Sequence, residues 1–155
     1  MSDIAYNAIK YIHVISAVIW VGGAFFAQVL AIRAQRSTDP AELPRLGAAI
    51  GELGMKVFLP AAIILFIAGI ILTIQRWAFS DTWISIAIVL WLVSALTGAL
   101  YLGPQSRKVG ELFSSEGPGS IKARAALARV FIVSRLELGS FAFIVFLMIF
   151  KPGEA

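Results

Sequence analysis

The sequence contains no cysteine, a single histidine and little charge. Without cysteine there are no disulfide bonds, thiolate metal sites or cysteine nucleophiles. Only 14% of the 155 residues are charged, whereas a water-soluble domain spends about 25% of its residues on charge. With 59% hydrophobic residues and a mean hydropathy of +0.88, the chain has too little polar surface for an ordinary soluble globule. The composition therefore indicates a protein whose solvent is a lipid bilayer.

Several common functional patterns are also missing from the sequence. It has no phosphate-binding loop, no Ser-His-Asp set and no carboxylate cluster with metal-binding spacing. The net charge of +4 and the pI near 9.8 do not point to nucleic acid, because basic residues of a membrane chain mainly set its orientation. The length leaves room for one domain. We therefore expect a single integral membrane domain over residues 1–155, without a nucleic-acid partner.

Four segments are predicted to cross the bilayer. A helix that rises about 1.5 Å per residue needs about 20 residues to cross about 30 Å of hydrocarbon. Three uncharged runs have this length, with 22 residues in 11–32, 19 in 57–75 and 25 in 82–106. A fourth run, 138–150, has only 13 and reaches spanning length if it begins at Val130. We predict an all-α membrane protein, a four-transmembrane-helix bundle with spans at about 8–32, 57–75, 82–103 and 130–150.

The segments between these spans have unequal charge. The connections after the first and third spans hold nine basic residues: Arg33, Arg36, Arg45, Lys56, Arg107, Lys108, Lys122, Arg124 and Arg129. The opposite side holds only Lys10, Arg76 and Lys151. The positive-inside rule then places the basic connections in the cytoplasm and both termini outside.

The basic connections also have helical patterns. In 41–56, apolar residues recur at helical spacing, which is typical of an amphipathic helix. The segment 120–134 repeats the pattern, and Ser120 can cap its first turn. We expect short amphipathic helices at the inner surface, leading into the second and fourth spans.

His13 is the main candidate for a functional residue. Tyr6, His13 and Trp20 are spaced by seven and share a stripe of the first span, with Ser16 close to it. In one interpretation His13 only hydrogen-bonds to a neighbouring helix or to a lipid headgroup. In the other, it is a metal ligand that binds haem iron, with its second ring nitrogen held by the Ser16 hydroxyl or a backbone carbonyl.

A six-coordinate haem needs a second axial ligand, which no second histidine can provide. Met148 is the candidate at matching depth, and a second copy of His13 across the twofold axis of a homodimer is the other solution. Copper is a weaker alternative, because Met1, Met55 and Met148 do not form a soft-ligand cluster with His13.

Arg135 and Glu137 are the charged residues of the fourth span. Two residues apart on a helix, they point about 200° away from each other, so each needs a partner elsewhere. Such charges tend to face a bundle interior or water. The favoured interpretation is that both lie at the inner interface and reach toward water. The alternative is that Arg135 binds an acidic ligand and Glu137 pairs with a basic residue of another helix.

The run HVISAVIWVGGAFF, which begins at His13, resembles the first-helix signature of a set of small bacterial membrane proteins. The set includes the membrane domain of the copper-resistance protein CopD, the HemJ-type protoporphyrinogen oxidases and a four-helix membrane family of unknown function, the last being most similar. The segment 101–104, the segment 127–136 and Lys151-Pro152-Gly153 add to this likeness. The resemblance implies a four-helix bundle in which His13 ligates haem. It does not supply the intramembrane lysine of the HemJ-type enzymes.

These observations lead to two functional hypotheses. The first is a b-haem redox or electron-transfer protein of the bacterial inner membrane, a possible haem-dependent oxidoreductase, with His13 as axial ligand and Met148, Ser16 and Trp20 near the cofactor. The second is a non-catalytic accessory or structural subunit of a membrane complex. Both predict contact with the lipid bilayer and assembly as a homodimer or in a larger complex.

Overall fold

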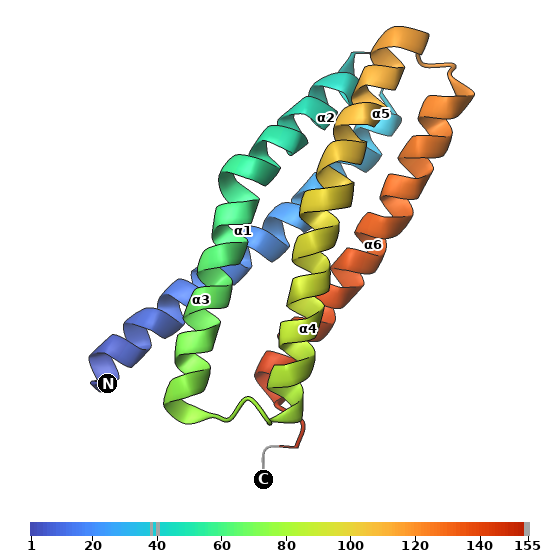
Figure 1. The fold of residues 1–155 in the computed structure, drawn as a ribbon. Helices are drawn as coiled ribbons and strands as arrows, with labels where there is room; N and C mark the ends of the chain where they lie inside the picture. Colours follow the sequence, from blue (N-terminus) through green and yellow to red (C-terminus); the bar gives the residue numbers. More distant parts are fainter. Residues whose placement is uncertain (38, 40, 154–155) are drawn as a thin grey trace.

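The computed structural model describes residues 1–37, 39 and 41–153 (Figure 1). The elements of this part run in the order α1 (Asp3–Gln35), α2 (Glu42–Leu53), η1 (Gly54–Phe58), α3 (Leu59–Arg76), α4 (Thr82–Thr97), η2 (Gly98–Leu102), α5 (Gly103–Glu116) and α6 (Ile121–Phe150). All are helices, and η1 and η2 are short π-helical segments. The predicted all-α fold is therefore confirmed.

In the part of the chain that the structure describes, four helices are long and apolar enough to cross a membrane, as predicted from the sequence. They are Asp3–Gln35, Glu42–Arg76, Thr82–Glu116 and Ile121–Phe150. The two middle helices are continuous through η1 and η2 and have 35 residues each. At about 1.5 Å per residue they are about 50 Å long, so each extends about 20 Å beyond the hydrocarbon of a typical bilayer.

The helix ends have recognisable local causes. The side chains of Ser2 and Ser120 cap α1 and α6 by accepting hydrogen bonds from backbone amides of the first turn, and the Ser120 cap was expected from the sequence. At the end of α5, Gly117 has a φ of 79°, a conformation that glycine adopts without strain. The chain therefore turns sharply between α5 and α6.

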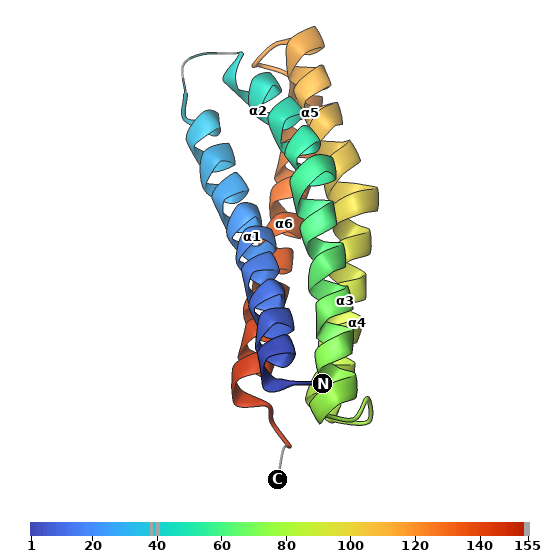
Figure 2. The same cartoon turned by 90° about the vertical axis from the view of Figure 1, so that its left-hand side faces the viewer.

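The two ends of the bundle differ in what they contain. Both termini and the short α3–α4 connection lie at one end, and the α1–α2 and α5–α6 connections lie at the other (Figures 1 and 2). At the terminal end the Trp77 and Trp83 rings meet edge to face at 5.6 Å, and the Lys151 ammonium lies 4.8 Å from the Trp77 ring centroid. Such aromatic and cationic side chains are favoured at the headgroup level.

The expected helices that lead into the second and fourth spans are present. Residues 42–56 run without a break into α3, and 121–134 form the first half of α6, so each segment is continuous with the span that it leads into. In addition, α2 packs against α5. Glycine allows this close approach, because a Cβ at Gly47 would lie 2.9 Å from the Ser106 carbonyl oxygen. The two segments therefore lengthen the bundle along its axis.

Apolar packing is divided among three levels of the bundle. Trp20, Ala62, Leu65 and Phe141 form the middle cluster, which joins α1, α3 and α6. A second cluster, around Trp83 and Leu147, joins α4 and α6 at the terminal end. The third joins α5 and α6 at the other end: Val109, Phe113 and Ala123.

Candidate functional site

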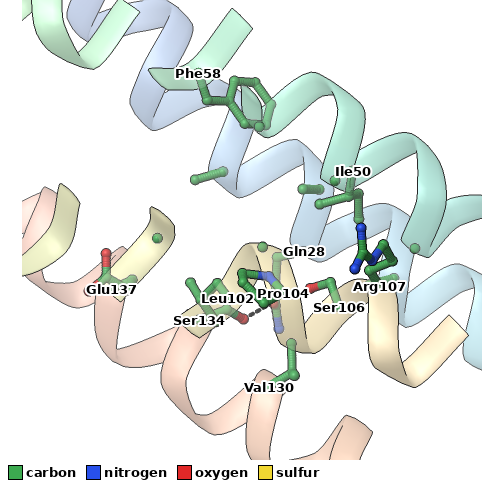
Figure 3. A pocket seen from close by; sticks show the side chains of 18 of the residues that line it. Gln28, Ile50, Phe58, Leu102, Pro104, Ser106, Arg107, Val130, Ser134 and Glu137 are labelled. Atoms are coloured by element: carbon green, nitrogen blue, oxygen red, sulfur yellow. Dashed lines mark hydrogen bonds between the residues drawn. The ribbon is translucent and has the colours of Figure 1, made fainter. Parts of the chain in front are cut away.

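A cavity of about 650 Å³ lies inside the bundle at the level of η1 and η2 (Figure 3). Every helix from α1 to α6 contributes to its wall. The space results from the sequence, because many of the inward positions at this level carry alanine or glycine: Ala24, Ala27, Ala31, Gly51, Gly54, Ala95, Gly98 and Ala99. Its volume is within the range of about 300–1,000 Å³ typical of small-molecule sites.

Gln28 and Ser134 form the first polar pair in the cavity wall. The Ser134 hydroxyl donates to the Gln28 carbonyl oxygen, a contact of 2.5 Å that links α1 to α6 (Figure 3). Gln28 is only 9% exposed, and its amide nitrogen has no hydrogen-bond partner within the described residues. A buried amide nitrogen without a partner is costly. This side chain therefore keeps one unsatisfied hydrogen-bonding group, which is itself covered by protein atoms.

Glu137 lies one helical turn along α6 from Ser134 and also lines the cavity. It is 9% exposed, and the hydroxyl of Ser94 on α4 donates a hydrogen bond to its carboxyl group. Ser94 is also 3.3 Å from the Ser140 hydroxyl. No lysine or arginine forms an ion pair with Glu137 in the part of the chain that the structure describes. Its carboxyl group thus has a hydroxyl neighbour and no countercharge.

The expectation that Arg135 and Glu137 both reach toward water is wrong for Glu137. Arg135 is exposed on the outside of the bundle, 5.8 Å from the Phe131 ring centroid, whereas Glu137 points inward. The difference follows from the 200° between their directions on the helix. The alternative interpretation, in which Glu137 pairs with a basic residue of another helix, is also wrong, because no such ion pair is present among the described residues.

The charged residues at the cavity rim are already paired. Arg107 lies 3.4 Å from Glu111, and Glu52 lies 2.7 Å from Lys56. Both pairs follow the i,i+4 spacing of a helix and are exposed. The rim charges thus have neighbours at the surface, in contrast to Glu137 deeper inside.

His13 lies outside the cavity, where α1 packs along α3. Its Nδ1 atom is 2.9 Å from the Leu65 carbonyl oxygen. The ring fits there because Gly69 has no side chain, and a Cβ at that position would lie 3.0 Å from the His13 Cε1 atom. The hydrogen bond from His13 to a neighbouring helix, one of the two interpretations of this residue, is therefore present.

The other residues predicted to surround a cofactor are spread over the bundle. Trp20 is in the middle cluster, with its ring 4.5 Å from that of Phe141, and it also lines the cavity. Ser16 is buried on α1. Met148 packs against the cluster around Trp83. The structure therefore does not gather Met148 and His13 into one contact group.

These features define a multi-pass helical membrane protein with a polar group of residues buried in its interior. The chain belongs to a family of predicted integral membrane proteins, DUF2269, whose model matches residues 7–152. No curated protein and no solved structure matches the chain significantly.

Proposed function

We propose that this protein binds a small, mainly apolar ligand inside the membrane, in the cavity between its helices. The observation that carries the proposal is that Glu137, nine-tenths buried and without an ion-pair partner among the described residues, lines this cavity together with Gln28. Polar groups inside a bilayer are costly, and those present in spans usually serve a substrate or an ion. A ligand that occupies the cavity would offer a partner to Glu137.

The mainly apolar wall indicates the general nature of the ligand. Phe58, Phe131 and Phe141 provide ring surfaces, and polar side chains are a minority of the lining residues. Such a site holds an apolar body and orients it by a few polar contacts. The ligand is expected to be lipid-soluble.

Filling the cavity tests this proposal. Gly98 lines the cavity with open space beside it, so Gly98→Leu places a side chain there. Binding of the neutral fluorophore 1-aminoanthracene to the purified protein is expected to weaken about tenfold, or about 1.4 kcal/mol. The matched control is Gly139→Leu, because Gly139 is exposed on α6 outside the cavity and also has open space. Equal binding by the wild type and both variants would contradict the proposal.

Haem binding at His13 is a second candidate function, supported by the bond to Leu65. A carbonyl oxygen only accepts, so Nδ1 donates and Nε2 of the neutral ring keeps its lone pair. This is the arrangement of metal-ligating histidines, whose second nitrogen is held by a carbonyl or carboxylate. Haem b bound there would supply one-electron redox chemistry, and the protein would then serve in electron transfer or as an oxidoreductase.

A single copy of the chain provides one axial ligand for haem, His13. His13 is not among the residues that line the cavity, and Met148 is packed in another cluster. The described residues contain no group of three metal-binding side chains. The haem candidate therefore favours the homodimer, in which a second His13 provides the other ligand. If neither the cavity nor His13 binds a small molecule, the accessory-subunit hypothesis becomes the better explanation.

We propose that the protein lies in a bacterial inner membrane with both termini outside the cytoplasm. The proposal rests on the concentration of basic residues at the end opposite the termini. The cysteine-free chain allows a direct test, because Ser80 and Ser114 are exposed at opposite ends. In intact cells a membrane-impermeant maleimide should label Ser80→Cys and spare Ser114→Cys. The reverse pattern would place the termini in the cytoplasm.

A further inference from the structure

Glu137 lies deep within its membrane-spanning helix and has no countercharge among the described residues. It lies about 20 Å along α6 from Phe150, the last residue of that helix, at about 1.5 Å per residue. With the terminal end at the headgroups, the carboxyl group is inside a hydrocarbon layer about 30 Å thick. An ionised carboxylate at such depth is stabilised mainly by a nearby positive charge. No such charge is supplied by the described residues.

The surroundings of Glu137 favour a cation over an anion. Trp20, Phe131 and Phe141 line the same cavity, and aromatic faces attract positive charge. The charged residues that share the cavity wall are Glu52 on α2 and Arg107 on α5, and both have partners at the rim. An anionic ligand would meet the Glu137 carboxyl group without a free basic group to offset it.

We infer that the cavity binds a lipophilic organic cation, with the Glu137 carboxylate as its counterion. This inference rests on the proposed ligand-binding function and specifies the class of ligand. The apolar wall receives the hydrocarbon or aromatic body of the cation, and the carboxylate, held by the Ser94 hydroxyl, receives its charge. Entry from the bilayer suits such a molecule, because it partitions into lipid while keeping its charge.

Tetraphenylphosphonium is the probe for the test, and triphenylphosphine oxide is a neutral compound of related shape. The wild-type protein in detergent is expected to bind tetraphenylphosphonium saturably in equilibrium dialysis, and triphenylphosphine oxide should compete poorly. Glu137→Gln removes the charge and keeps the shape, so binding should weaken about tenfold or more. Glu137→Asp keeps the charge and should retain most of the binding.

The control is Glu42→Gln, which makes the same change in the first turn of α2, outside the cavity. It is expected to bind the cation like the wild type. Three results would overturn the inference: no saturable binding by the wild type, equal binding by Glu137→Gln, or equal competition by triphenylphosphine oxide. If Gly98→Leu still weakens 1-aminoanthracene binding in any of these cases, the cavity remains a ligand site and only the cation is wrong.

Discussion

Haemin added to the purified wild-type protein is expected to give a Soret band and reducible b-type bands, which His13→Ala should abolish. The reason is that His13 is the single histidine of the chain and Leu65 holds its Nδ1 atom, leaving Nε2 for iron. Gly69→Leu should have a similar effect, because a side chain at that position would occupy the space of the His13 ring. The measurement is the absorption spectrum of each protein, oxidised and dithionite-reduced.

Met148→Leu separates the two sources of the second axial ligand. Because Met148 packs against the cluster around Trp83, the variant is expected to keep the wild-type spectrum and the haem to bind two copies of the chain. A spectral change confined to Met148→Leu would instead favour ligation by this methionine. A colourless wild-type protein, after expression with ample haem, would exclude His13 as a haem site.

Phe141→Ala is expected to lower the free energy of unfolding by about 3–5 kcal/mol. Phe141 is 4% exposed and contacts Trp20 in the middle cluster, which ties α6 to α1 and α3. Helices in a bilayer are held together by close packing more than by hydrophobic transfer, and the variant enlarges an interior that already has a cavity. The measurement is unfolding by sodium dodecyl sulfate in mixed micelles, followed by far-UV circular dichroism.

Phe143→Ala is the matched control, since Phe143 is on the same helix and is 47% exposed. Its removal should change the free energy of unfolding by about 1 kcal/mol or less. Equal losses for the two variants would mean that the middle cluster does not hold the bundle together. A loss for Phe143→Ala alone would place a helix contact on the outer face of α6.

The spans were predictable because length and lack of charge alone determine whether a helix can cross a bilayer. The helical content of 41–56 and the Ser120 cap were also visible in local patterns. The inward direction of the Glu137 side chain was not predictable. The 200° between Glu137 and Arg135 places them on opposite faces of the helix, but it does not say which of the two faces the bundle interior. The cavity was missed for a related reason. Its wall is made largely of small residues, none of which indicates a cavity by itself. The one signal in the sequence was Gln28, an uncharged polar residue within the first span.

The π-helical segments η1 and η2 change which face of each long helix is turned toward its neighbours. A π-turn is an α-helix with one extra residue, and one residue corresponds to about 100° of rotation. The stripe that α2 presents to α5 therefore does not continue in phase with the stripe that α3 presents to α1. One uninterrupted helix can thus serve two different neighbours, one at each end.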